Sequence, residues 1–226
     1  MALSVDYVYQ YMLKLIRKNQ SAAISAGDFA YFWNGEQRAF FSDLMGRFNK
    51  NTNSKLRLDT GLIENETIMT KLLPFTKPLV NQPVSAGNGT KPTDFVYTLA
   101  VRINGNKVFQ VNHDSIWSVN QDVIDPPSIA DDSYYYVEYL NYYSFLPSSV
   151  TQFDLDYISS PPDVLWAYTL DVNNRQVYDP ANSVQPLWSN SDCSEITQRC
   201  LKQIGVSFSS QDFENFGQQT IVEGSA

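Results

Sequence analysis

The spacing of apolar residues predicts helices in the first third of the chain. Over 4–18, apolar residues recur every three or four positions and form one stripe: Val5, Val8, Met12, Leu15 and Ile16. A second helix is predicted to begin at Ser25, because Asp28 stands three residues further on, as in a capping box. Gly46 is expected to end this helix, and a shorter helix is predicted over 62–73.

The middle of the chain has the alternating pattern of β-strands. Apolar residues take every second position over 95–103, and the dipeptide Asn104-Gly105 predicts a hairpin with a return strand over 107–111. A tyrosine-rich strand is predicted over 133–145 and an alternating strand over 150–158. This region therefore predicts an antiparallel sheet.

A capped helix is predicted after the sheet. Ser189 is a good N-cap with Asp192 three residues on, and Gly205 is the expected stop. The same capping pattern at Ser209 predicts a second short helix. The helix that begins at Ser189 has one apolar stripe, formed by Cys193, Ile196, Cys200, Leu201 and Ile204.

These elements indicate an α+β fold with N-terminal helices, a central antiparallel β-sheet and C-terminal helices. We expect residues 1–90 and 186–226 to form a helical domain and residues 91–185 a β-rich domain, unless the whole chain packs as one compact unit.

Composition favours a packed core together with interfaces. Hydrophobic residues make up 43% of the 226 residues, which is enough for a sizeable core. The 14 tyrosines and 13 phenylalanines also suit surfaces where proteins meet. The net charge of −8 disfavours tight general binding of nucleic acid, but it is compatible with a passive conduit for DNA.

Cysteine and histidine are too few for most metal or nucleophilic sites. Cys193 and Cys200 lie roughly 10 Å apart along a helix, beyond disulfide reach, so we expect two core thiols and a reducing compartment. His113, the single histidine, has no nucleophile motif near it. We expect no cofactor, no zinc site and no catalytic site. No signal peptide is expected over 1–20, and a run of about 18 apolar residues that could cross a membrane is absent.

Weaker chemical alternatives remain open. Asp131-Asp132, or the pair Asp154 and Asp156, could hold calcium or magnesium, and the latter pair could also serve a hydrolase, but solvated carboxylates are the favoured interpretation. Residues 87–91 resemble a phosphate loop only superficially and are predicted to be a flexible connector.

The tyrosine-rich run has two interpretations. It could form a carbohydrate-binding face, or a sheet buried on one side and covered by a neighbouring subunit on the other. We favour the second, because a two-sided apolar sheet would be a liability in a monomer. The candidate subunit-interface residues are Tyr134, Tyr135, Tyr136, Tyr139, Tyr142, Tyr143, Trp166, Tyr168 and Trp188.

Short runs of packing and turn residues follow one another in a recognisable order. In the second half they are Leu146-Pro147, Phe153 to Ile158, Pro161-Pro162, Trp166 to Tyr168, Val177 to Pro180, Ser183-Val184, Trp188, Glu195-Ile196 and Leu201 to Val206. In the first half they are Lys18 to Gln20, Ile24-Ser25, Asp28-Phe29, Asn34, Gln37 and Leu73 to Phe75. Together they resemble virion structural proteins of tailed phages that infect Bacteroidetes, including crAss-like phages.

The resemblance is strongest over 146–217 and points to a neck ring protein, or head-to-tail adaptor. It implies a homo-oligomeric ring, commonly dodecameric, that joins the portal protein to other neck and tail proteins and lines the DNA channel. It further implies passive contact with packaged DNA, no membrane partner, no enzymatic activity, and a place in the virion after assembly in the host cytoplasm. A carbohydrate-binding accessory module remains the alternative.

Overall fold

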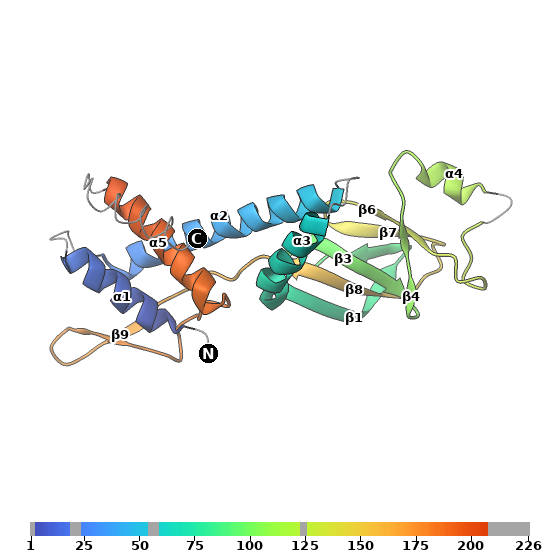
Figure 1. Ribbon diagram of the computed structural model, residues 1–226. Helices are drawn as coiled ribbons and strands as arrows, with labels where there is room; N and C mark the ends of the chain where they lie inside the picture. Colours follow the sequence, from blue (N-terminus) through green and yellow to red (C-terminus); the bar gives the residue numbers. More distant parts are fainter. Residues whose placement is uncertain (1–2, 19–23, 54–58, 123–125, 208–226) are drawn as a thin grey trace. The chain divides into compact units, whose positions relative to one another are not determined.

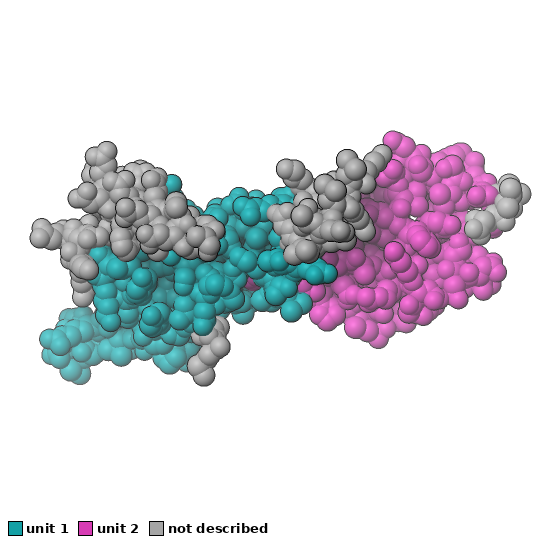
Figure 2. All heavy atoms as spheres, in the orientation of Figure 1, with its two compact units in different colours: residues 1–74, 161–226 teal, residues 75–160 magenta. Residues whose placement is uncertain are grey.

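The computed structural model describes residues 3–18, 24–53, 59–122 and 126–207 (Figure 1). The chain is α+β, as the sequence predicts, and divides into two compact units (Figure 2). Unit 1 comprises Met1–Pro74 and Pro161–Ala226, and unit 2 comprises Phe75–Ser160. The observed division at 75 and 160 differs from the predicted one at 91 and 185, because two strands precede residue 91 and the segment after 160 packs on helices.

Unit 1 contains the helices α1 (Val5–Lys18), α2 (Ala26–Asn53), α3 (Asp59–Leu72) and α5 (Asn190–Ser207). The predicted capping box is present at α2, where the Asp28 amide donates to Ser25 Oγ (3.1 Å) and the Ser25 amide donates to Asp28 Oδ2 (3.2 Å). Gly46 does not end α2, because the buried stripe continues through Phe48 and outweighs the low helix propensity of one glycine.

Helix α5 begins at the predicted cap. The Asp192 amide donates to Ser189 Oγ (3.3 Å), and the five residues of the predicted stripe are all buried. The helix passes Gly205 and ends at Ser207, two residues beyond the predicted stop. Both cysteines are buried and carry free thiols. The helix predicted from Ser209 lies outside the described residues.

Unit 2 is a sheet with the strand order β4-β3-β8-β1-β2-β7-β6-β5, in which only β5 and β6 pair in parallel. The strands are β1 (Thr76–Ser85), β2 (Asn88–Thr90), β3 (Phe95–Ile103), β4 (Asn106–Lys107), β5 (Phe109–Gln110), β6 (Tyr135–Glu138), β7 (Tyr142–Leu146) and β8 (Gln152–Ser159). The predicted tyrosine-rich strand is thus a hairpin of β6 and β7.

The first and last strands of this order are consecutive in the chain, so the sheet closes on itself. The Val108 amide donates to the Val101 carbonyl of β3 (3.1 Å), and the Phe109 amide donates to the Tyr134 carbonyl next to β6 (3.1 Å). One short segment thereby bonds both edges and makes a small barrel, an arrangement that protects strand edges. Its interior is filled by Val101, Ile103, Val108, Tyr134, Tyr136, Tyr143, Phe145, Val150, Phe153, Leu155 and Tyr157.

The strand β3 matches its predicted bounds but not its predicted faces. Its register against β8 shifts twice, between Phe95 and Tyr97 and between Thr98 and Ala100. Such bulges reverse the alternation of side chains. Val101 and Ile103 are buried as predicted, but Tyr97 and Leu99 are only half-buried.

The predicted connector over 87–91 is a strand instead. A turn at Ala86 and Gly87, both with positive φ, joins β1 to β2. Gly89 lies so close to the barrel interior that a Cβ there would stand 2.5 Å from Phe153 Cε1. The strand β1 escaped prediction because Pro78, Pro83 and an irregular register at Leu79–Gln82 break its alternation.

Each unit has one further segment, a short helix in unit 2 and a two-stranded ribbon in unit 1. In unit 2, the connection from β5 to β6 carries a short helix, α4 (Ile116–Asn120), which has no buried residue. In unit 1, the strands β9 (Tyr168–Leu170) and β10 (Gln176–Tyr178) form a separate two-stranded ribbon. Among the described residues, no helix has the length and apolar character needed to span a membrane.

Candidate assembly surfaces

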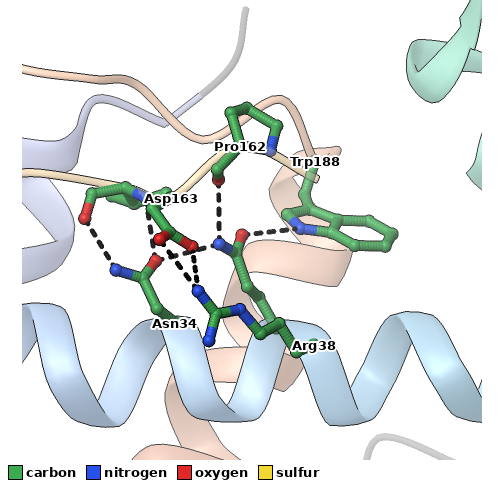
Figure 3. Close-up of polar contacts among 7 residues, drawn as sticks. Asn34, Arg38, Pro162, Asp163 and Trp188 are labelled. Carbon is green, nitrogen blue, oxygen red and sulfur yellow. Dashed lines mark hydrogen bonds and ion pairs between the residues drawn. The ribbon is translucent and has the colours of Figure 1, made fainter. Parts of the chain in front are cut away.

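A polar anchor holds the segment after Pro161 against α2 (Figure 3). Asn34 contacts both backbone groups of Val164: its Oδ1 accepts from the amide (2.8 Å) and its Nδ2 donates to the carbonyl (3.0 Å). Gln37 Nε2 donates to the Pro162 carbonyl (2.9 Å). The segment is therefore bound as a strand would be, although by side chains of a helix.

The polar anchor continues to the start of α5. Gln37 Oε1 accepts from Trp188 Nε1 (3.3 Å), and Gln37 and Trp188 are each 1% exposed. A buried amide whose groups are all bonded fixes a geometry, because any misplacement leaves an unpaired polar atom. Beside it, Arg38 and Asp163 form an exposed ion pair (2.6 Å).

A second anchor fixes the root of the ribbon on α1. Trp166 Nε1 donates to Asp6 Oδ1 (2.9 Å), and the Trp166 ring lies 4.5 Å from that of Tyr9 between centroids. Tyr168 and Tyr178 stack on Trp166 with centroids 5.7 and 5.9 Å away. The base of the ribbon is thus packed and bonded.

Beyond its base, the ribbon is exposed. Leu170 is 60% exposed, Val177 is 49% exposed and Val172, at the tip, is 99% exposed. The neighbouring Leu165 and Leu187 are each 46% exposed. The ribbon carries exposed apolar side chains on both faces, because Leu170 pairs with Gln176 and Val177 pairs with Thr169.

Five of the nine predicted interface residues lie inside their own units. Tyr134, Tyr136 and Tyr143 fill the barrel, and Trp166 and Trp188 form the two anchors of unit 1. All five are buried. The three tyrosines are buried because the sheet curves into a barrel and turns one tyrosine face inward, and the two tryptophans are buried against the helices of unit 1. Burial raises the pKa of Tyr136 to about 12 and also raises the pKa of Tyr143.

The other four predicted residues are accessible. Tyr142 is 37% and Tyr168 is 43% exposed, while Tyr135 and Tyr139 are half-buried. The Tyr139 and Tyr142 rings stack with centroids 4.6 Å apart. Both flank Leu140, which is 88% exposed at the turn of the β6–β7 hairpin. Exposed apolar residues elsewhere in unit 2 include Trp117 (71%), Val80 (62%) and Phe109 (58%).

One buried cation lies in the barrel. The Lys91 side chain is 5% exposed, and its Nζ lies 2.7 Å from Glu138 Oε1 and 4.2 Å from the centroid of the Phe95 ring. Thr98 Oγ1 donates to Glu138 Oε1 (3.2 Å) and lies 2.8 Å from Tyr143 OH. Every member of this group has a partner, so the group holds strands together and leaves no free nucleophile.

The chemical candidates do not assemble into a site. His113 is exposed and lies edge-on to Tyr139, with centroids 4.7 Å apart. Asp156 pairs with Arg102, and Asp154 accepts from the Asn81 amide. Burial raises the pKa of the Cys193 thiol to about 12, which makes it a poor nucleophile. Within the described part of the chain, no group of three or more His, Cys, Asp or Glu residues could hold a metal ion.

Comparison with known proteins adds no relative. No protein-family model matches the chain, and no curated protein is significantly similar to it in sequence.

The sequence patterns did not predict the exposed apolar residues of the β9–β10 ribbon. Aromatic content drew attention to 133–145 and away from the apolar residues of 165–187, which lie in a segment rich in loops. The alternation of Trp166, Tyr168, Leu170 and Val172 with smaller or polar residues, followed by Asn173-Asn174, is the signal that could have predicted the β9–β10 hairpin.

Proposed function

We propose that this protein is a virion structural protein that forms an oligomeric ring in the neck of a tailed phage, joins the portal to the tail and lines the DNA channel. The proposal rests on the positions, in the fold, of the residues that resemble virion structural proteins. Three segments far apart in sequence, around Asn34 and Gln37, at Pro162 and at Trp188, form one bonded anchor. Part of the resemblance thus follows one packing arrangement in unit 1.

Exposed apolar surface supports a role in assembly. Unit 1 presents the ribbon, and unit 2 presents Trp117, Leu140 and Phe109. Large apolar side chains exposed in clusters mark contacts with other proteins. Assembly is the proposed mechanism, and the chain acts without catalysis or a cofactor.

Charge is compatible with a channel for DNA. The net charge of −8 disfavours tight binding to the phosphate backbone. A lining that binds DNA weakly lets it slide, whereas a basic lining would retain it. The contact with packaged DNA in this proposal is therefore passive.

Purified phage particles provide the direct test. Mass spectrometry should find the protein in virions at many copies per particle, and cryo-electron microscopy of the neck should show it as a closed ring next to the portal. Absence of the protein from purified virions, or its location in the capsid shell or tail fibres, would overturn the proposal.

A carbohydrate-binding role is favoured only by the stacked pair of Tyr139 and Tyr142. Since the barrel hides Tyr134, Tyr136 and Tyr143, this pair and the half-buried Tyr135 are what remain of the proposed sugar-binding face. Binding on a glycan array that disappears in Tyr142→Ala and persists in Tyr135→Ala would support this alternative over the ring.

A further inference from the structure

The sequence contains three Asn-Gly pairs, which begin at Asn34, Asn88 and Asn104. Such a pair is chemically labile, because the backbone nitrogen of the glycine can attack the asparagine side-chain amide and glycine has no side chain to block the approach. The attack requires a glycine amide without a hydrogen bond and an asparagine side chain that can turn toward it. The fold meets these two conditions very differently at the three pairs.

The pair at Asn34 is held in both respects. Gly35 lies inside α2, where each backbone amide donates to the carbonyl four residues before it. The Asn34 side chain is bonded at both of its polar atoms, because Nδ2 donates to the Val164 carbonyl (3.0 Å) and Oδ1 accepts from the Val164 amide (2.8 Å). Attack at Asn34 therefore requires α2 and the polar anchor to open together.

The pair at Asn88 lies in a strand that has a neighbour on each side. Asn88 is paired with Ser85 of β1 and with Ser144 of β7. Its side chain is exposed, but Gly89 is buried so close to the Phe153 ring that even a Cβ would not fit. Ring closure at this pair would have to bend the backbone where the close-packed barrel interior leaves no space.

The pair at Asn104 lies in the two-residue turn between β3 and β4. Asn104 and Gly105 are both exposed, and their φ angles are 51° and 82°. Among the described residues, the Gly105 amide has no hydrogen-bond partner, and the Asn104 side chain has only a long contact, 3.5 Å from its Nδ2 to Tyr134 OH. A Cβ at Gly105 would meet nothing within 4 Å. Both conditions for attack are therefore met in this turn.

We propose that Asn104 is a site of spontaneous deamidation in the folded protein, and that the fold protects Asn34 and Asn88. The Gly105 nitrogen bonds to Asn104 Cγ, and Nδ2 leaves as ammonia with the proton that this nitrogen gives up, which closes a succinimide ring. Water then adds to one of the two ring carbonyls and breaks the bond of that carbonyl to nitrogen. The product is aspartate, or isoaspartate in which the main chain runs through the side-chain carboxyl group. This site goes beyond the proposed ring and does not depend on it.

Isoaspartate changes the turn that precedes the closure of the barrel. It lengthens the main chain by one carbon in a two-residue turn, which sets the register of Ile103 against Asn106. The segment that follows bonds both edges of the sheet through the Val108 and Phe109 amides. Because a longer turn displaces these amides from their acceptors, we expect the isoaspartate form to be less stable than the parent.

Peptide mapping by tandem mass spectrometry tests the site, after incubation of the full chain at neutral pH. Conversion at Asn104 should be at least about ten times faster than at Asn34 or Asn88, if the fold raises the barrier at those two by about 1.4 kcal/mol or more. In urea the three rates should become similar, because the three pairs share one local sequence and differ in the fold around them. The rate at Asn104 should rise with pH, since the Gly105 amide must lose a proton.

Two results would overturn the proposed site. One is conversion at Asn34 or Asn88 in the folded chain that is as fast as at Asn104. The other is an Asn104 that stays intact in the folded chain over a time in which the chain in urea is fully converted, which would show that the turn protects it.

Two variants test the effect on the barrel. Asn104→Asp adds the carboxylate but keeps the ordinary main chain, so fresh Asn104→Asp should unfold at a higher urea concentration than aged parent enriched in isoaspartate. Asn104→Ser has no amide to lose, and its midpoint should not change during the same incubation. Equal midpoints of aged parent and fresh Asn104→Asp, or an equal loss by aged Asn104→Ser, would contradict the effect of the longer turn on barrel closure.

Discussion

In the barrel of unit 2, one segment that contains β4 and β5 bonds both edges of the sheet and aromatic side chains fill the interior, whereas the β9–β10 ribbon of unit 1 is a sheet of two strands whose side chains beyond the base are exposed. The barrel has a packed core of its own. The ribbon is packed at its base, where Tyr168 and Tyr178 stack on Trp166. Substitutions can therefore distinguish residues that keep the chain folded from residues that the fold leaves exposed.

The largest expected effect comes from the barrel core. Phe153→Ala should lower the free energy of unfolding of unit 2 by about 4 kcal/mol, because it empties a site lined by Phe145 and Tyr143. Near-ultraviolet circular dichroism should lose the contribution of the buried barrel tyrosines Tyr134, Tyr136 and Tyr143. In a Trp117→Phe background, tryptophan fluorescence comes from Trp33, Trp166 and Trp188 of unit 1 and should change little.

The matched control is Val172→Ala at the ribbon tip, where we expect a change within about 0.5 kcal/mol. A loss of stability at Val172 as large as that at Phe153 would show that the ribbon is part of a core, and the contrast between barrel and ribbon would be wrong.

Alkali should also act on the barrel more than on exposed tyrosines. Burial raises the pKa of Tyr136 from 10.0 to about 12, so between these values the unfolded chain has lost a proton that the folded chain keeps. Stability is complete below pH 10 and falls as pH rises, by about 3 kcal/mol for this one phenol. Tyrosinate absorbance should rise together with the loss of barrel circular dichroism.

Tyr136→Phe provides the comparison for that titration, since it removes the shifted phenol and keeps the ring. The onset of alkaline unfolding should move to higher pH in this variant. Titration of all tyrosines near their ordinary pKa in a barrel that stays folded would contradict the assignment of Tyr136 to the interior.

Sequence patterns predicted the elements whose side chains follow one period. The bounds of β3, the cap of α5 and its buried stripe were all predictable, because each depends on local spacing. Closure of the barrel was not, since it depends on the Val108 and Phe109 amides bonding strands on either side of them. Local patterns contain no information about such long-range pairing.

The candidate assembly surfaces were also only partly predictable from local sequence patterns. The sequence drew attention to tyrosines by their number, but number does not indicate which face of a curved sheet turns inward. Tyr134 and Tyr143 are core residues, while Val172 and Leu170, which no pattern singled out, are exposed. Exposure is a property of the tertiary fold, so an interface is hard to predict from composition alone.

A smaller effect is expected at the glycine on the barrel wall. Gly89→Ala should destabilise unit 2 by about 2 kcal/mol, because the new Cβ would stand 2.5 Å from Phe153 Cε1 and 2.9 Å from Phe145 Cε2. Gly35→Ala is the matched control on α2, where a Cβ meets nothing within 4 Å. There the same substitution should stabilise unit 1 by up to about 1 kcal/mol through helix propensity. Equal effects of the two in urea unfolding would contradict the close packing at Gly89.

The smallest effect tests whether the ribbon is held by a polar anchor as firmly as the barrel is held by its core. Gln37→Leu keeps roughly the same volume and removes the bonds of the Gln37 amide to Asn34 Oδ1, the Pro162 carbonyl and Trp188 Nε1. We expect a loss of about 1 to 2 kcal/mol, measured by tryptophan fluorescence during unfolding. Arg38→Ala, next along α2, breaks only an exposed ion pair and should cost less than about 1 kcal/mol. If Arg38→Ala cost more than Gln37→Leu, the segment would be held by the exposed ion pair of Arg38 and Asp163 and not by the buried amide of Gln37.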